Sequence, residues 1–236
     1  VDLSRPETLT TADRIRGSLT AFACGDALGA TVEFMHPDSV RAEFGVHRDI
    51  TGGGWLHLEP GGVTDDTQMT LFTAEGLIRA WVRGCLKGIT TYSGVTAHAY
   101  LRWLQTQGER PTCDIDFGTD EPGWLFQQRP LHSRRAPGNT CLSALVEMRS
   151  PGRPAGNESK GCGGVMRMAP VGLFAFSLRD RMPPDEAFSL GTELAALTHG
   201  HSTGHLPGGV LAVLVMALAD GATLPSALVT AKALLR

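Results

Sequence analysis

The sequence predicts an all-α protein of one domain, and three observations support this fold class. Apolar residues recur at steps of three and four along most of the chain, which places them on one face of a helix. No segment alternates apolar and polar residues between turn dipeptides, as a half-buried strand would. The 236 residues contain no low-complexity linker, so a single large core is expected.

The first half of the chain contains two predicted helices. One covers 11–28 with Thr11 as its cap, and a loop rich in glycine and proline, 52–62, separates it from the second, which Thr64 is placed to cap. The apolar face of the first comprises Ile15, Leu19, Phe22 and Ala23. That of the second comprises Leu71, Ala74, Ile78, Trp81, Val82 and Cys85.

The second half is predicted to be helical over 93–105, 139–148, 184–197, 207–219 and 225–234. Asn139 is the expected cap of its helix. Two long polar stretches rich in glycine and proline, 108–138 and 150–164, lie between these helices. Loops of this length are uncommon in a compact domain unless they are functional, so both are candidate binding loops.

The last helical pattern, 228–234, reaches the end of the chain without a glycine, asparagine or proline to stop it. We therefore expect residues 1–236 to form one domain that is incomplete at its C-terminus.

Composition and charge argue against several classes of protein. With a formal net charge of -3 and Lys and Arg spread thinly, the chain shows no basic stripe, and nucleic acid is not an expected partner. Residues 1–11 lack the basic start and apolar stretch of a secretory signal, and no run of about 18 apolar residues is present, so no membrane contact and a cytoplasmic location are expected. Five cysteines without C-x-x-C spacing indicate neither a disulfide framework nor a structural zinc site.

The strongest cluster of chemically active residues is Thr64, Asp65, Asp66 and Thr67, directly behind two glycines and at the start of a helix. Adjacent carboxylates and hydroxyls are hard oxygen ligands that suit magnesium, calcium or manganese. Without a cation, the two carboxylates are expected to raise each other's proton affinity. The alternative is that Thr64 only caps the helix, whose first turn favours acidic residues.

Two further carboxylates come earlier in the chain. Asp26 shares a helix face with Phe22, so it must find partners near the core and could orient a backbone turn or a metal ligand, or serve as a structural hydrogen-bonding residue. Glu33 could reach a metal or activate a water, and the alternative is an ordinary surface glutamate.

Residues 159–164, Ser-Lys-Gly-Cys-Gly-Gly, precede a helical pattern that starts near Val165. The glycines would let backbone amides approach an anion at a helix N-terminus, although the Walker A order is absent and a flexible connector is the alternative. Arg167 is expected to make a structural ion pair. His199, His201 and His205 lack the H-E-x-x-H spacing, so polar contacts are expected of them and zinc is not, and Cys162 is not expected to be a nucleophile.

Together these motifs resemble those of ADP-ribosylglycohydrolases in order and spacing. The resemblance is carried by 25–29 with Glu33, by 64–67, by 161–167 with Pro170 and by 197–199, and it extends from Asp13 to about Met216. It implies an orthogonal helical bundle with a two-magnesium centre in a cleft, where the metals hold the distal ribose of ADP-ribose. Manganese could take the place of magnesium. It also implies hydrolysis of the glycosidic bond between ADP-ribose and an acceptor, and we expect the chain to be a monomer.

The resemblance implies a role for each matching residue. Thr64, Asp65 and Asp66 match the family's first metal-binding motif, and Glu33 matches a residue at the metals that is implicated in metal binding, gating or water activation. The family's loop that contacts the pyrophosphate and adenosine side of ADP-ribose is matched by Ser159, Lys160, Gly161 and Gly163. His199 matches a substrate-contacting histidine. Glu33, Asp65 and Asp66 are therefore the expected catalytic residues.

The family's last metal motif, Gly-Asp-x-Asp-Ser/Thr, has no match after Met216. One explanation is the incomplete C-terminus expected above. The alternative is a catalytically impaired relative, similar to the structural lens crystallins of this family or able only to bind ADP-ribose. A metal phosphohydrolase that acts on nucleotides is a third possibility.

Overall fold

The computed structural model describes residues 9–54, 57–112, 114 and 123–235. Within these ranges the chain forms nine α-helices and two short 3-10 helices, and its only β-type pairing is an isolated bridge between Gly53 and Leu58. The predicted all-α class is therefore confirmed. Residues 113 and 115–122 of the candidate binding loop 108–138 lie outside the described residues.

The helices lie close to the predicted ranges. They are α1 (Thr11–Ala30), α2 (Pro37–Phe44), α3 (Asp65–Lys87), α4 (Tyr92–Thr106), α5 (Asn139–Val146), α6 (Ala169–Ser177), α7 (Pro184–Ala196), α8 (Ser202–Ala219) and α9 (Leu224–Ala233), with the 3-10 helices η1 (Arg129–Leu131) and η2 (Cys162–Gly164). The short helix α2 was not predicted. His36 caps it by accepting a hydrogen bond from the backbone N–H of Asp38 at 3.3 Å, and proline occupies its first position.

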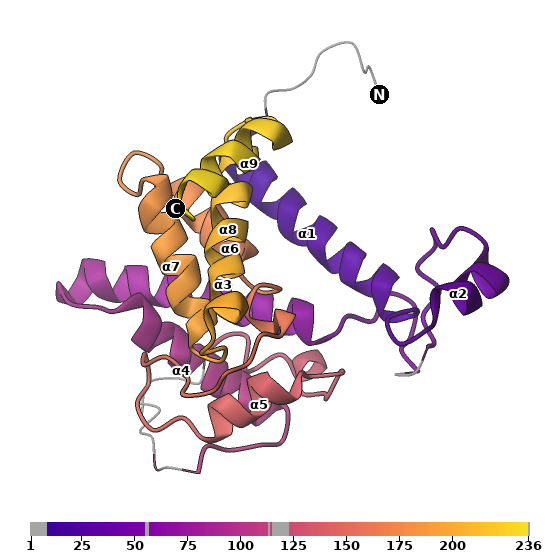
Figure 1. Ribbon diagram of the computed structural model, residues 1–236. Helices are drawn as coiled ribbons and strands as arrows, with labels where there is room; N and C mark the ends of the chain where they lie inside the picture. Colours follow the sequence, from indigo (N-terminus) through magenta and orange to yellow (C-terminus); the bar gives the residue numbers. More distant parts are fainter. Residues whose placement is uncertain (1–8, 55–56, 113, 115–122, 236) are drawn as a thin grey trace.

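The core lies between α3, α4, α6, α7 and α8, which pack together as a bundle (Figure 1). Large side chains such as Phe72, Tyr100, Trp103 and Leu194 are fully buried there. Helices α7 and α8 approach closely because glycines face each other: a Cβ on Gly191 would lie 2.7 Å from the carbonyl oxygen of Gly208. Even alanine would force these two backbones apart.

Helix α8 corrects one expectation from the sequence. Residues Ser202–Ala219 are long and apolar enough to cross a membrane by length and composition, although no such segment was expected. The helix contains no charged residue, but its serine, threonine, histidine and glycines interrupt a strictly apolar run, so counting apolar residues missed it. In this structure α8 packs against α6, α7 and α9, as the core helix of a bundle does.

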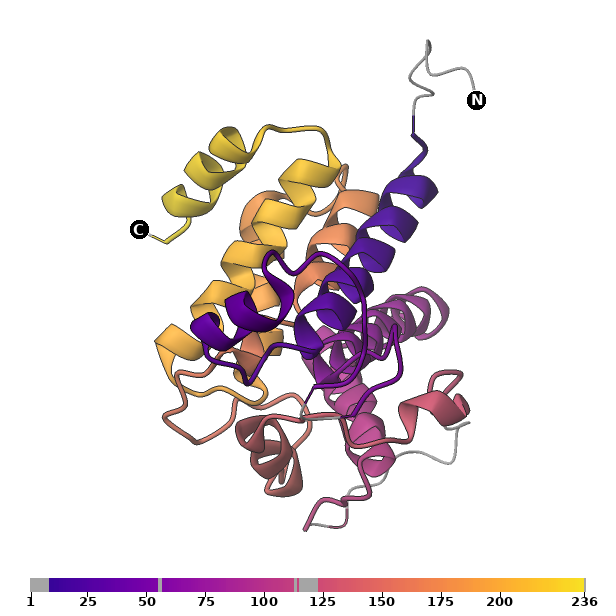
Figure 2. The same cartoon turned by 90° about the vertical axis from the view of Figure 1, so that its right-hand side faces the viewer.

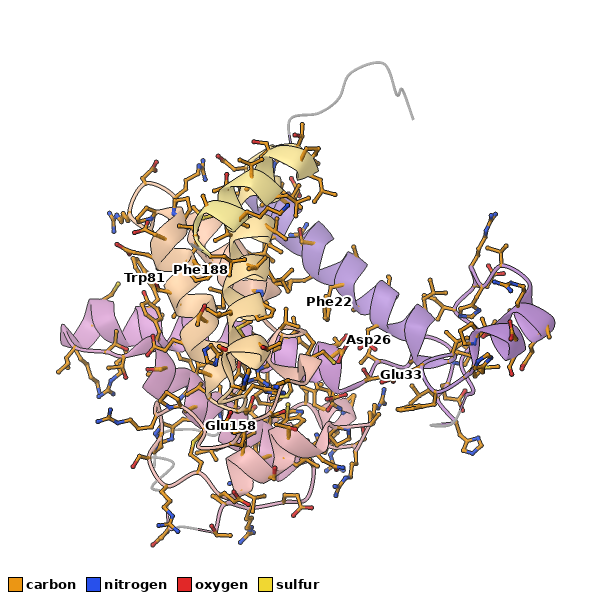
Figure 3. All side chains as sticks on the ribbon, in the orientation of Figure 1. Phe22, Asp26, Glu33, Trp81, Glu158 and Phe188 are labelled. Atoms are coloured by element: carbon orange, nitrogen blue, oxygen red, sulfur yellow. The ribbon has the colours of Figure 1, made fainter. Side chains whose placement is uncertain are left out.

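Helix α1 lies at the side of the bundle and is much less buried (Figures 1 and 2). Only Ala27 and Ala30 of this helix are buried, while its predicted apolar face is half-buried. Phe22, on that face, is labelled in Figure 3. Near its start, Arg14 Nη1 donates to the carbonyl oxygen of Ala219 at 3.2 Å, and near its end Asp26 contacts the start of α3. Polar contacts therefore hold α1 near both ends.

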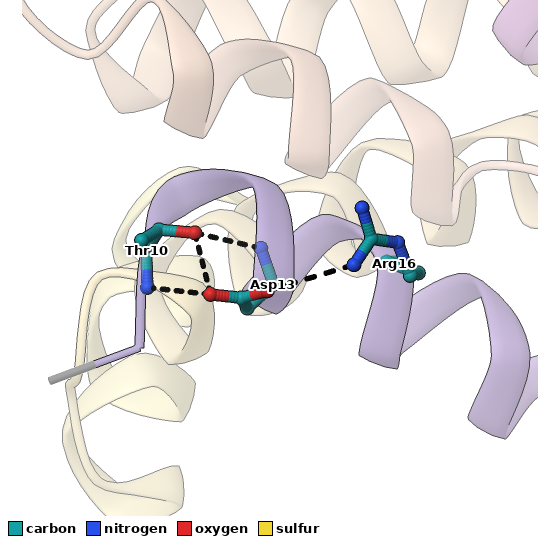
Figure 4. Close-up of polar contacts among 3 residues, drawn as sticks. All are labelled: Thr10, Asp13 and Arg16. Atoms are coloured by element: carbon teal, nitrogen blue, oxygen red, sulfur yellow. Dashed lines mark hydrogen bonds and ion pairs between the residues drawn. The ribbon is translucent and has the colours of Figure 1, made fainter. Parts of the chain in front are cut away.

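Two predicted caps are shifted by one residue, and one helix starts earlier than predicted. Thr10, not Thr11, caps α1, because its hydroxyl and the carboxylate of Asp13 form a reciprocal capping box (Figure 4). Gly138 is the cap position of α5, so Asn139 is its first residue. Helix α8 starts at Ser202 because His201 caps it, which places Pro207 inside the helix.

Candidate active site

The carboxylate of Asp26 organises the turn that precedes α3. Its two oxygens accept four hydrogen bonds: from the backbone N–H groups of Thr64 and Thr67 at 2.9 and 3.1 Å, and from their hydroxyls at 2.8 and 2.5 Å. Thr64 also caps α3, as predicted, by accepting from the N–H of Asp66 at 3.3 Å. Asp26 therefore orients a backbone turn that carries two further carboxylates, one of the roles expected for it.

Asp65 is buried at the base of this turn, with 6% of its surface exposed. Its backbone N–H donates to the carbonyl oxygen of Arg135 at 3.0 Å, and its side chain accepts from the N–H of Gly138 at 3.3 Å. Burial, and secondly the charge of Asp66, raise the pKa of Asp65 to about 7. The raised proton affinity is therefore as expected, but the crowding is not mutual: Asp66 contributes to the shift of Asp65 after burial, whereas Asp26 and Glu33, and not Asp65, are the charges that raise the pKa of Asp66.

Asp66 and Glu33 share the same acidic environment. Burial, then the charges of Asp26 and Glu33, raise the pKa of Asp66 to about 6. Partial burial and the charge of Asp26 raise the pKa of Glu33, which is otherwise exposed. Figure 3 shows Asp26 and Glu33 at the same end of α1, on the side where α3 begins. We refer to Asp26, Glu33 and 64–67 as the acidic half of the site.

The acidic half has the donor chemistry that a hard divalent cation requires. Its carboxylates interact electrostatically, and Thr64 Oγ1 donates one hydrogen bond and accepts one, which leaves a lone pair for a further ligand. No three His, Cys, Asp or Glu side chains of the described residues are yet arranged around one metal position. The donor set thus fits magnesium or manganese by chemistry but is not preassembled.

The glycine loop lies directly against the ring of His199. A Cβ on Gly163 would lie 3.0 Å from His199 Cε1 and 2.8 Å from Cys141 Sγ, and a Cβ on Gly164 would lie 2.6 Å from the carbonyl oxygen of Gly204. Gly161 has more room, since its Cβ would be 3.5 Å from His199 Nε2. Two of the predicted site residues, Gly163 and His199, are therefore in direct contact because glycine has no side chain.

Side chains of the loop itself keep it in place. Asn157 Nδ2 donates to the carbonyl oxygen of Thr198 at 2.9 Å, and Asn157 Oδ1 accepts from the N–H groups of Gly200 and Ser159, both at 3.1 Å. Ser159 Oγ accepts from the N–H of Gly161 at 3.3 Å, so this amide is not directed at a ligand, in contrast to the expectation for the loop. Lys160, between them, is exposed.

Arg167 supports the loop from below and is fully buried. Its guanidinium donates to the carbonyl oxygen of Gly163 at 2.8 Å, to the hydroxyl of Thr198 at 2.6 Å and to that of Tyr100 at 3.0 Å, and it lies 4.5 Å from the Tyr100 ring centre. The expected ion pair is wrong, because none of the described carboxylates contacts this side chain. Neutral acceptors and an aromatic face satisfy the charge instead.

His199 is held by the same network. Its Nδ1 lies 2.9 Å from Thr198 Oγ1, and burial together with the charge of Arg167 lowers its pKa to about 4. The ring is therefore neutral at physiological pH. His201 caps α8, and His205 Nδ1 lies 3.1 Å from the carbonyl oxygen of His199, so both make the polar contacts expected of them. We refer to 157–164, Arg167 and His199 as the loop half.

The first turn of α5, with its cap residue Gly138, connects the two halves. This connection was not predicted from the sequence. The N–H of Gly138 donates to Asp65, Thr140 Oγ1 lies 3.1 Å from Ser159 Oγ, and the Cys141 thiol donates to the carbonyl oxygen of Gly163. The sequence signal was the polar loop that ends at α5, which indicates a binding region but not its contacts. The acidic turn and the glycine loop, far apart in sequence, therefore lie on one side of the molecule.

Comparison with known proteins gives consistent results. The sequence profile of the family described as ADP-ribosylglycohydrolase matches residues 7–236. The chain is 52% identical over 210 residues to the ADP-ribosyl-[dinitrogen reductase] glycohydrolase of Rhodospirillum rubrum, which covers 84% of this chain and 59% of that protein. It is 39% identical over 207 residues to the ADP-ribosylarginine hydrolase Tri1 of Serratia proteamaculans, covering 81% and 48%. The chain thus spans about half the length of the curated relatives it matches.

Proposed function

Because the chain belongs to the ADP-ribosylglycohydrolase family, we propose that it serves the magnesium-dependent hydrolysis of the glycosidic bond between ADP-ribose and an acceptor. The observation that carries this proposal is the link through α5, which places the acidic half beside the loop half. Carboxylates can hold a cation beside the glycosidic bond, and a close-fitting glycine loop with the exposed Lys160 can meet the pyrophosphate, so the two halves offer complementary chemistry.

Thr64, Asp65, Asp66 and Glu33 would hold the magnesium or manganese, since they supply the hard oxygens of the acidic half. When bound, the cation would orient the ribose hydroxyls and lower the pKa of a water close to the anomeric carbon. Asp26 keeps the turn in shape through its four hydrogen bonds, so the carboxylates of Asp65 and Asp66 can point away from it.

Glu33 is the best candidate to take a proton from the attacking water. It is exposed at the edge of the acidic half, and its raised pKa brings a carboxylate closer to the neutral range where a general base is effective. The negative charges of Asp65 and Asp66 would also favour an oxocarbenium-like state on the ribose. Asp65, Asp66 and Glu33 are therefore the catalytic residues of this proposal.

The loop half would bind the pyrophosphate and adenosine side. Gly161 and Gly163 allow close approach of the ligand, the ammonium of Lys160 is exposed, and Ser159 keeps the loop tied to α5. His199 is neutral, so it can contact the substrate without adding a positive charge. Fixed loop geometry would position the ribose for attack, which is the main contribution of binding residues that do not react.

We further propose that the acceptor is an arginine side chain. This rests on the printed name of the Tri1 relatives, which are ADP-ribosylarginine hydrolases at 39% and 36% identity. The N-glycosidic bond to a guanidinium has a good leaving group once protonated, and an acidic site favours a cationic acceptor. An acidic half with three carboxylates and Asp26 meets this requirement.

The test is to incubate the chain with ADP-ribosyl-arginine and ADP-ribosyl-serine, with magnesium or with a chelator, and to identify products by mass spectrometry. We expect free ADP-ribose and arginine only with magnesium, and none from the Asp65→Asn variant. Release of AMP would instead indicate a nucleotide phosphohydrolase. Binding of ADP-ribose without turnover would indicate a structural or ADP-ribose-binding relative.

A further inference from the structure

The outer face of α3 carries two parallel stripes of side chains in its C-terminal half. Ile78, Val82 and Leu86 recur every four residues and are 49%, 46% and 79% exposed. Beside them, Arg79, Arg83 and Lys87 recur with the same spacing. Residues four apart lie above one another on a helix, so an exposed apolar stripe runs next to a basic stripe. The expectation of no basic stripe is therefore wrong for this face, because basic residues four apart look scattered in the linear sequence.

A cavity of about 800 Å³ opens beside these stripes, between α3, the following turn and the start of α4. Its basic lining consists of Arg79, Arg83, Lys87, His98 and Arg102. None of the described residues that line it is acidic, and Ile89, which is 70% exposed, extends its apolar rim. A concave surface that combines apolar side chains with one sign of charge is typical of a binding site.

The floor of the cavity contains donors that the described protein does not satisfy. Arg102 is 94% buried: its Nη2 donates to Glu75 at 3.2 Å, whereas its Nε has no hydrogen-bond partner among the described residues. The buried hydroxyl of Thr90, also in the lining, has none either. Both atoms are shielded from solvent and lie behind the cavity surface, so the acceptor groups of a ligand would meet the exposed guanidinium of Arg83 and ammonium of Lys87 first.

This face is remote from the candidate active site. Asp65 begins α3 and Arg79 lies fourteen residues later, which corresponds to roughly 20 Å along the helix axis. In Figure 3, Trp81 marks this part of α3 and lies on the opposite side of the view from Asp26 and Glu33. A ligand here would leave the acidic half and the loop half open.

We propose that this face of α3 and α4 docks an acidic, amphipathic segment of a partner protein. The apolar stripe continues past the cavity to Leu86, which does not line it, so the stripe is longer than a small anion needs. Anchors spaced by four residues match the apolar face of a bound helix, and acidic residues at its flank would meet Arg79, Arg83 and Lys87. A local positive face on a chain with a net charge of -3 would also select an acidic partner and increase its rate of association.

A random-peptide phage library gives a test that needs no knowledge of the partner. The wild-type chain is the target, and selection is counter-screened with Arg79→Glu/Arg83→Glu/Lys87→Glu. We expect enriched peptides with Asp or Glu beside aliphatic or aromatic residues. In fluorescence anisotropy, a synthetic copy of an enriched peptide should bind the wild-type chain. It should bind the triple variant and Ile78→Ser/Val82→Ser at least tenfold more weakly, and its affinity for wild type should fall as the salt concentration rises.

The matched control is Arg48→Glu/Arg181→Glu/Lys232→Glu, which makes the same change in net charge at exposed positions elsewhere. It should bind the peptide like wild type, and all variants should melt like wild type because the altered side chains are exposed or rim the cavity. The proposal is overturned if no acidic peptide is enriched, or if enriched peptides bind the triple variant equally well. Self-association, or binding to phosphatidylserine vesicles, that this variant abolishes would reassign the face and overturn it too.

Discussion

The two halves of the candidate site are built in opposite ways. In the loop half, a fully buried guanidinium donates to neutral acceptors on three surrounding segments, and glycines allow the loop to rest on His199. In the acidic half, negative charges gather on a turn that Asp26, from the less buried helix α1, holds in place. The buried charge of the loop half is satisfied by neutral acceptors inside the protein, whereas the like charges of the acidic half raise the pKa of Asp65 and Asp66.

This difference indicates how each half would meet its ligand. The loop half is complete before any ligand binds, so it can supply a rigid surface for the ADP-ribose moiety. The acidic half carries raised pKa values at Asp65 and Asp66 because its charges are buried together. A divalent cation would relieve that repulsion, and protons compete for the same oxygens.

The largest effect is expected for the centre of the loop half. Arg167→Met should lower the free energy of unfolding by about 3–5 kcal/mol, because Gly163, Thr198 and Tyr100 lose their buried donor. Urea denaturation followed by circular dichroism measures the change. Arg149→Met, at an exposed position, is the control and should stay within about 0.5 kcal/mol of wild type. A loss below about 1 kcal/mol at Arg167 would contradict a preorganised loop half.

The acidic half should respond next, through Asp26, which makes four hydrogen bonds to its turn. Asp26→Ala removes four hydrogen bonds to a carboxylate and should cost about 2–3 kcal/mol of unfolding free energy in chelator. Asp26→Asn is the matched variant: its amide oxygen can still accept from Thr64 and Thr67, so we expect less than half that loss. Equal losses for the two variants would show that charge, and not hydrogen bonding, holds the turn.

Gly161 and Gly163 belong to the same loop, but their replacement by alanine is expected to change stability by different amounts. Gly163→Ala should destabilise the chain by about 1–3 kcal/mol, because the new Cβ would lie 2.8 Å from Cys141 Sγ and 3.0 Å from His199 Cε1. Gly161→Ala should be close to neutral, since its Cβ meets only contacts of 3.5 Å or more and its φ of -67° suits any residue. Thermal melts of both variants decide this, and similar Tm losses would mean that the loop shifts freely.

The smallest effect is expected for magnesium and pH. The pKa of Asp65 is about 7 in the folded chain, against its ordinary value of 3.8, so the folded state holds more protons between these values. In chelator it therefore loses stability as pH rises through this window. Magnesium should therefore stabilise the chain more at pH 8 than at pH 5, and at a concentration several times Kd we expect a gain of about 1 kcal/mol in the free energy of unfolding, measured as a higher Tm. Asp65→Asn/Asp66→Asn should remove both the pH dependence and the response. A larger response at pH 5 would be inconsistent with competition between protons and cation.

The sequence predicted most helices because their apolar positions repeat with the helical period, and it identified 64–67 because a threonine cap followed by two acids is a local pattern. What it could not supply were contacts between distant segments. Arg167 was expected to pair with a carboxylate, since isolated sequence gives no hint that carbonyls and hydroxyls surround it. The link through Thr140 and Ser159 likewise depends on how α5 packs.

The most direct test of the two-halves account is calorimetric titration of ADP-ribose into the chain, in chelator and in magnesium, with Asp65→Asn/Asp66→Asn alongside. The account predicts binding in chelator through the loop half, tighter binding with magnesium, and loss of only that gain in the double variant. If ADP-ribose fails to bind in chelator, or if the magnesium gain survives in the double variant, the halves do not work as proposed here.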